Sequence, residues 1–299
     1  MVSDATTPLP AELAQLFADG GAGWTLPVAL PAGRLVRPRS PGGDTPAYWL
    51  SDQPAPATLW SRLRAAHSRS GLWPLLLEGL DNEPARPWLA GEVHPQPVGQ
   101  IDHHDAARFL ASVWSGWVRF VEEDYEPDFV VEALAPFGRD WPGLAPPGAP
   151  VGDPDVVADQ CAAGLEDGQA RLGLVAADRG ADTLALSGWT GPANHAKTAP
   201  LAAVVRSWED RFGVRVVRVG LPPVLERRCT PRHHRTCAAG RRRALGVLPR
   251  QHRAGLGRYA GGLCQADPWQ EHVVVLVGLI QTTVPDPCGR DSRSRAIHP

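Results

Sequence analysis

Four potential metal ligands lie close together in the C-terminal part of the chain. Thiolate and imidazole groups are the ligands that Zn²⁺ prefers in tetrahedral sites, and two of each fall within nine residues here: Cys229, His233, His234 and Cys237. Their spacing, C-x3-H-H-x2-C, departs from the paired C-x2–4-C and H-x3–5-H arrangement that surrounds a tetrahedral ion without strain. We therefore predict neither a metal site nor a cofactor.

A second group of chemically capable residues surrounds a loop rich in glycine and proline, WTGPANH. Loops held on a rigid scaffold are where binding groups concentrate. We predict six binding candidates in this loop and in the segment that follows it: Trp189, Asn194, His195, Arg206, Glu209 and Asp210. The pattern identifies no catalytic residue among them.

Two of these candidates, Glu209 and Asp210, are adjacent on a predicted helix. Adjacent side chains diverge by about 100° around a helix, which disfavours the facing carboxylates of acid–base chemistry. We interpret both as ordinary helix charges beside a core residue, Trp208.

The remaining reactive side chains have plainer interpretations. His103 and His104 are adjacent and point to different faces of a helix, which disfavours joint ligation. Asp105 suits the start of that helix, and Cys161 is expected to be a small buried hydrophobe. The dinucleotide, P-loop, zinc-protease and serine-hydrolase signatures are absent from the sequence.

The elements that must position these residues alternate between helix and strand. Apolar periodicity and turn residues predict short strands at 34–36, 47–50, 73–77, 171–176 and 214–219, and helices at 11–17, 58–67, 102–121, 155–165, 181–186 and 198–212. This alternation predicts an α+β fold in which helices pack on a small mixed sheet, with a disrupted or irregular C-terminal part. The order of the strands is not readable from the pattern.

Helix boundaries are predicted from capping residues. Asp102 is expected to cap the helix that runs to Val121, and Thr198 the helix over 198–212. Gly213 can take the left-handed conformation that ends the second of these helices.

The chain divides into four predicted regions. An N-terminal α+β region covers residues 1–140, and the stretch WPGLAPPGAPVGDP at 141–154 forms a Pro/Gly linker because it can neither propagate a helix nor serve a central strand. Residues 155–220 form a truncated α+β domain. Residues 221–299 lack sustained periodicity, so we predict a largely irregular tail with a strand near 273–279.

Charge divides the chain at the same place. Residues 1–220 hold 17 basic and 27 acidic side chains, whereas residues 221–299 hold 13 and 5. No apolar run approaches the roughly 18 residues that span a bilayer, and the N-terminal segment lacks the basic and apolar regions of a signal peptide. We expect a soluble cytoplasmic protein without a membrane partner.

Residues 171–220 contain the segments ADTLALSGWTGPANH and LAAVVRSWEDRFGVRVVRVG. With these segments they resemble the domain of unknown function 4253 family. In that family a segment like ADxLxxLGWxGPxNH is followed by SAVLRSWEDRFGARVVxVGF. The family continues with a segment like AxxHFAFCPDN and ends near WSFWWD, and neither is present here. The resemblance implies no known activity.

Both missing motifs can be recovered by shifting the reading frame by one base. Residues 243–253 can be back-translated so that the shifted frame reads EHLAFCPDNI, and residues 272–280 so that it reads MWSFWWD followed by a stop. The genetic code permits this reading without forcing it. We infer that residues 221–299 are translated out of frame.

Three functions stay open. The first is a non-catalytic interaction module whose Trp-rich surfaces contact another protein, suggested by the 11 tryptophans and the missing catalytic motifs. The second is an enzyme that uses His195 with residues lost from the tail. The third, nucleic-acid binding by the basic tail, is not expected because no recognition helix or aromatic ladder accompanies the arginines.

The frame change predicts a property of the gene. The frame that starts at the second base of each codon should stay open from codon 221 and reach a stop near codon 280. Sequencing the gene, with mass spectrometry of tail peptides, tests this. Stop codons in the shifted frame between codons 221 and 270 would contradict it.

Overall fold

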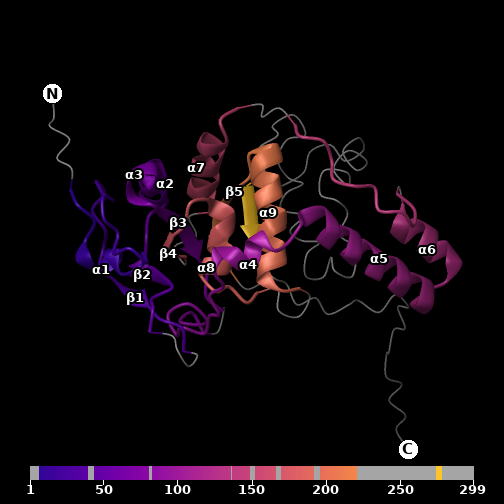
Figure 1. Cartoon of the computed structure of the whole chain (residues 1–299), viewed down its shortest axis with the longest axis horizontal. Coiled ribbons are helices and arrows are strands. Elements are labelled where there is room, and N and C mark those ends of the chain that lie inside the picture. The colour runs from indigo at the N-terminus through magenta and orange to yellow at the C-terminus, as the bar shows by residue number, and fades with distance from the viewer. Residues whose placement is uncertain are drawn as a thin grey trace, which may run out of the picture.

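The structure, a computed structural model, describes residues 7–39, 44–80, 83–135, 137–148, 152–165, 170–191, 196–220 and 274–277. The predicted α+β class is confirmed, because helices pack on both faces of a mixed sheet (Figure 1). In the described part of the chain, no helix combines the length and the apolar character needed to cross a membrane.

The sheet combines antiparallel and parallel pairs. Its strands are β1 (Gly33–Val36), β2 (Tyr48–Pro54), β3 (Leu72–Leu77), β4 (Arg171–Ala176), β5 (Arg215–Val219) and β6 (Val274–Val277), in the order β1-β2-β4-β3-β5-β6. The first three neighbouring pairs are antiparallel, and β3–β5 and β5–β6 are parallel. Strand β6 lies inside the segment for which a strand is predicted, and the rest of the tail lies outside the described residues.

Strand β3 shows why the sheet is covered on both faces. All six of its residues are buried. Successive side chains of a strand point to opposite faces, so Trp73, Leu75 and Leu77 join one apolar core, and Leu72 and Leu76 join the other. A strand that is apolar at every position needs a covering layer on each side.

Helices form these layers. The described helices are α1 (Ala11–Ala14), α2 (Ala57–Ala65), α3 (His67–Ser70), α4 (Val98–Asp102), α5 (Ala106–Asp124), α6 (Pro127–Leu134), α7 (Pro154–Gly164), the 3₁₀ turn η1 (Gly180–Asp182), α8 (Thr183–Leu186) and α9 (Thr198–Phe212). Buried residues of α8 and α9 belong to the first core, whereas those of α1, α2 and α7 belong to the second.

Helices α5 and α6 pack on each other and extend away from the sheet on the side opposite β1 (Figure 1), while α5 also packs on α9. Their apolar side chains make a third core that includes Trp114, Trp117 and Leu134. The sequence pattern predicts α5 but not α6.

Two predicted caps are wrong by a few residues. Asp102 ends α4, and the cap of α5 is Asp105, whose carboxylate accepts a hydrogen bond from the Arg108 N–H. Thr198 is the first residue of α9, and its hydroxyl donates to the Trp189 carbonyl at 2.7 Å. In both cases a tertiary contact uses the side chain that local spacing assigned to a cap.

The regions that the sequence divides share one sheet. Strand β4, from the family-like segment, lies between β2 and β3 of the N-terminal region. The described residues between α6 and α7, which include most of the predicted linker, form neither helix nor strand. The ranges 1–140, 141–154 and 155–220 therefore describe successive stretches of the chain. They do not describe units that each fold around a core of their own.

Gly213 ends α9 with a φ of 69°, as its predicted left-handed role requires. A Cβ at this position would lie 2.6 Å from Pro154 Cγ. We predict that Gly213→Ala lowers the free energy of unfolding by about 1–2 kcal/mol, because a side chain in the left-handed region adds strain. Urea denaturation measures the change.

The matched control for this prediction is Gly164→Ala, at the exposed end of α7, where an added Cβ meets no atom within 4 Å. This change should leave stability unaltered or raise it slightly. Equal destabilisation by both variants would show that the conformation of Gly213 is not the cause.

Candidate functional site

A polar cleft of about 430 Å³ lies beside the end of β4. Parts of α2, α3, α7, α9 and the turn after β4 contribute side chains to it. The lining residues are Arg64, Ala65, His67, Ser68, Trp73, Asp155, Asp178, Arg179, Gly180, Glu209, Asp210 and Arg215. Charged groups of both signs dominate this lining.

The turn after β4 fixes one wall of the cleft. Ala177 N–H donates to the Gly71 carbonyl, which ties the end of β4 to the start of β3. Gly180 then passes so close to the core that an added Cβ would lie 2.8 Å from the Trp73 ring and 2.9 Å from Glu209 Oε1. Glycine is required here because a side chain would occupy the same space as these two groups.

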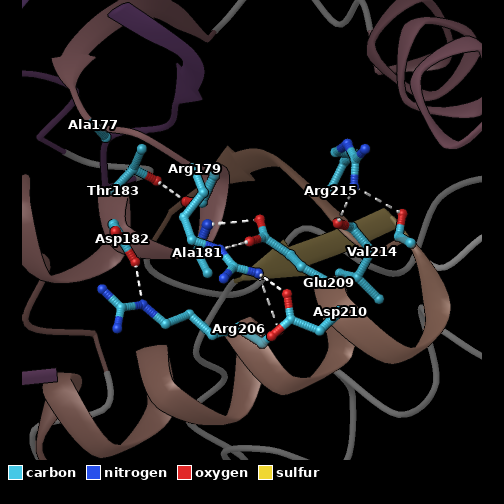
Figure 2. Close-up of polar contacts among 12 residues, drawn as sticks. Ala177, Arg179, Ala181, Asp182, Thr183, Arg206, Glu209, Asp210, Val214 and Arg215 are labelled. Atoms are coloured by element: carbon cyan, nitrogen blue, oxygen red, sulfur yellow. Dashed lines mark hydrogen bonds and ion pairs between the residues drawn. The ribbon is translucent and has the colours of Figure 1, made fainter. Parts of the chain in front are cut away.

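Arg179 connects this turn to α9. Its Nε donates to Glu209 Oε2 at 2.6 Å, and its Nη2 donates to Asp210 Oδ1 at 2.5 Å. Figure 2 shows the Arg179 side chain lying between the two carboxylates. The second oxygen of Glu209 accepts a hydrogen bond from Ala181 N–H at 2.8 Å. One guanidinium group therefore fixes both carboxylates and the start of η1.

Burial governs the acid–base behaviour of Glu209. Its side chain is only 5% exposed, and this burial raises the pKa of the carboxyl group above its ordinary value, against the opposite effects of Arg179 and Ala181 N–H. Burial also lowers the pKa of Arg179, but the hydrogen bonds to Glu209 and Asp210 outweigh that effect and raise it.

A second ion-pair group forms the opposite wall of the cleft. Arg64 binds Asp159 through two parallel hydrogen bonds of 2.8 Å and contacts Asp155 at 2.9 Å. The other oxygen of Asp155 accepts from Arg215 Nε at 2.7 Å. Asp155 thus bridges two arginines from different elements, α2 and the start of β5.

Two aromatic rings complete the lining. Trp73 donates its indole N–H to the Val216 carbonyl at 2.9 Å, and His67 Nε2 lies 2.7 Å from the Ala177 carbonyl. The two rings meet edge to face, with centroids 5.0 Å apart. These contacts fix both rings, so this part of the cleft is rigid.

Three of the six predicted binding residues lie in or beside this network. Glu209 and Asp210 line the cleft. Arg206 binds Asp182 at 2.5 Å and Asp102 at 2.6 Å, and its hydrogen bond to Asp182 raises its pKa. Asp182, with a side chain 3% exposed, lies in η1 and accepts this hydrogen bond from Arg206 (Figure 2).

Of the other three predicted residues, only Trp189 is described, and it does not line the cleft. Trp189 is buried. Its indole N–H donates to the Gly220 carbonyl at 3.2 Å, and Gly220 follows the end of β5 opposite to Arg215. Asn194 and His195 lie outside the described residues.

The structure corrects the interpretation of Glu209 as an ordinary helix charge beside a core Trp208. Glu209 is buried and the neighbouring Trp208 only partly so, because η1 covers the side of α9 that carries Glu209. Although the side chains of Glu209 and Asp210 diverge around the helix, they still contact a common partner. Both carboxylates reach the same guanidinium group from different sides.

The residues that the sequence pattern missed are Arg64, His67, Trp73, Asp155, Asp178, Arg179 and Arg215. One local signal was readable: the polar run Asp178-Arg179-Gly180 directly follows a buried strand, which is where loop residues often carry function. The remaining partners come from distant segments, so no local spacing reveals them.

Metal binding has no support in the described part of the chain. No group of three or more His, Cys, Asp or Glu side chains there could hold an ion. Cys161 is half-buried. Cys229, His233, His234 and Cys237 lie outside the described residues.

Comparison with protein families confirms the resemblance noted in the sequence. The model of the family described as "Domain of unknown function (DUF4253)" matches residues 171–234. The match therefore begins at β4, covers the turn, α9 and β5, and ends inside the segment that we infer to be out of frame. No curated protein matches this chain, and no solved structure does.

The raised pKa of Glu209 predicts a pH dependence of stability. Above the ordinary pKa of 4.5 and up to the raised value, the folded state binds more protons at Glu209 than the unfolded state does. Its contribution to the free energy of unfolding must therefore fall as pH rises through this window. In Glu209→Gln this contribution is absent.

Urea denaturation of both proteins from pH 4 to pH 7 tests the prediction. The unfolding free energy of the natural protein minus that of Glu209→Gln should decrease as pH rises. The control is Glu123→Gln, on the exposed side of α5, which removes a carboxylate away from the cleft. A difference that grows with pH for Glu209→Gln would mean that Arg179, and not burial, decides the protonation of this carboxyl.

Proposed function

We propose that this protein is a cytoplasmic, non-catalytic interaction module that binds another protein through the polar cleft. The observation that carries the proposal is the state of Glu209. This carboxyl has a raised pKa, as catalytic acids often do, but both of its oxygens are already occupied, by Arg179 and by Ala181 N–H. A buried group whose two oxygens both have partners within the protein supports a structural role.

The lining residues hold one another in place, and this also favours a binding role over a catalytic one. General acid–base and nucleophilic catalysis need a group that is free to contact the reacting atoms. In the described lining, Arg64, Arg179, Arg215, Asp155 and Glu209 all have ion-pair partners. Groups held in this way present a fixed pattern of charge, which lowers the ordering cost of binding.

Burial of the tryptophans corrects the expectation that Trp-rich surfaces contact another protein. None of the described tryptophans is exposed, and five are among the largest fully buried side chains: Trp60, Trp88, Trp114, Trp117 and Trp189. They are core residues, so a Trp-rich contact surface is not part of the proposal. The exposed polar groups at the cleft are Ser68, Asp178 and Asp210.

Site-specific photo-crosslinking tests the proposal. A benzophenone amino acid at Ser68, which is exposed and lines the cleft, should form a covalent complex of one defined mass in a lysate of the source cells. Excess unlabelled protein should suppress this complex. The matched control carries the same amino acid at Ser115, an exposed serine of α5, and should not form it.

Two results would contradict the interaction module. Identical patterns from Ser68 and Ser115 would mean that capture is nonspecific. Adducts with the mass of a small metabolite at Ser68, without a protein complex, would favour a small-ligand site or an enzyme instead.

A further inference from the structure

We propose that the cleft binds the cationic end of an arginine or lysine side chain of the partner. This inference rests on the proposed interaction module and names the chemistry that the module recognises. It follows from a comparison of two sets of charges in the cleft: those that ion pairs already neutralise and those that remain for a ligand.

The three arginines of the lining look at first like a site for an anion, but the charge of each is already paired with a carboxylate. Arg64 is held by Asp159 and Asp155, Arg215 by Asp155, and Arg179 by Glu209 and Asp210. An anionic ligand would meet guanidinium groups whose charges are already balanced by carboxylates at 2.5–2.9 Å.

Carboxylates outnumber these arginines. Five acidic groups line the cleft or pair with its arginines, namely Asp155, Asp159, Asp178, Glu209 and Asp210, against three guanidinium groups. The local field is therefore negative. A negative cleft with low-dielectric walls attracts cations and repels anions.

Two of the carboxylates can contact a ligand directly. Asp178 is exposed, and none of the residues that the structure describes forms a hydrogen bond or ion pair with its side chain. Asp210 is 62% exposed, and the described contact with Arg179 uses one of its two oxygens. Carboxylates with free acceptor positions are the natural partners of guanidinium and ammonium groups.

The shape of the cleft suits a long side chain better than a simple ion. The half-buried His67 ring lies among the charged groups, and an aromatic wall packs against the methylene stem of arginine or lysine while the charged end reaches the carboxylates. The volume of about 430 Å³ falls in the range of sites for small organic groups.

Calorimetric titration of the full chain with N-acetyl-arginine methylamide tests the inference. The arginine probe should bind with one site, and added NaCl should weaken the binding because charge attraction is screened. N-acetyl-citrulline methylamide, which has nearly the same shape without the charge, should not bind detectably.

Variants locate the site. Asp178→Asn, which removes no described contact, should weaken binding of the arginine probe by about tenfold or more, since a charge-assisted hydrogen bond is lost. Asp210→Asn should also weaken it. The matched control is Asp124→Asn, an exposed aspartate at the end of α5, and its binding should equal that of the natural protein.

Three outcomes would overturn the inference: no binding of the arginine probe, equal binding of the citrulline probe, or binding of inorganic phosphate that Asp178→Asn leaves unchanged or strengthens. Crosslinking from Ser68 separates this failure from that of the interaction module. A captured protein together with no arginine binding refutes the cation and keeps the module. Arginine binding without a captured protein refutes the module and keeps the chemistry of the cleft.

Discussion

The position of β4 in the sheet is the constraint on which the rest of the structure depends. This strand hydrogen-bonds to β2 on one side and to β3 on the other, and both neighbours come from the first 80 residues of the chain. Its interior side chains, Leu172 and Leu174, are fully buried. Because the strand is central, the residues that follow it must leave the sheet between α2 and α9, and this exit creates the cleft.

Ion pairs then hold the elements around that exit. A buried pair gains little net stability over an apolar pair of similar size, but removing one partner leaves a charge without compensation and is costly. Glu209 and Asp182 are the most buried carboxylates of this network, and each is held by an arginine from another segment. The arrangement therefore specifies how the turn after β4 sits on α9 more than it adds to overall stability.

Local patterns predicted the elements well and the site only in part. The apolar run of β3, the β-branched run of β5 and the left-handed Gly213 are signals contained in a few neighbouring residues, and each predicted its element. Two caps and helices α4 and α6 were missed. The strand order was not predictable, since pairing between Trp73 and Val175 joins residues about a hundred positions apart and no local pattern encodes it.

The same limit explains the candidate site. Arg206, Glu209 and Asp210 were found because they lie near a recognisable loop and helix, whereas Arg64 and Arg215 were not, since only folding brings them to Asp155. Burial of Glu209 could not be predicted either. It depends on η1, which covers α9 only after β4 has taken its place.

Insertion of β4 also has a consequence for synthesis on the ribosome. Strands β2 and β3 emerge long before β4, and each presents an open row of backbone donors and acceptors until residues 171–176 arrive. Non-local pairing of this kind carries a loop-closure cost and slows folding. Leu72, Leu75 and Leu76 are already present on the nascent strand β3. Roughly a hundred further residues must be translated before β4 pairs with the open edge of this apolar strand. The nascent chain is therefore a natural client for chaperones that bind extended apolar segments.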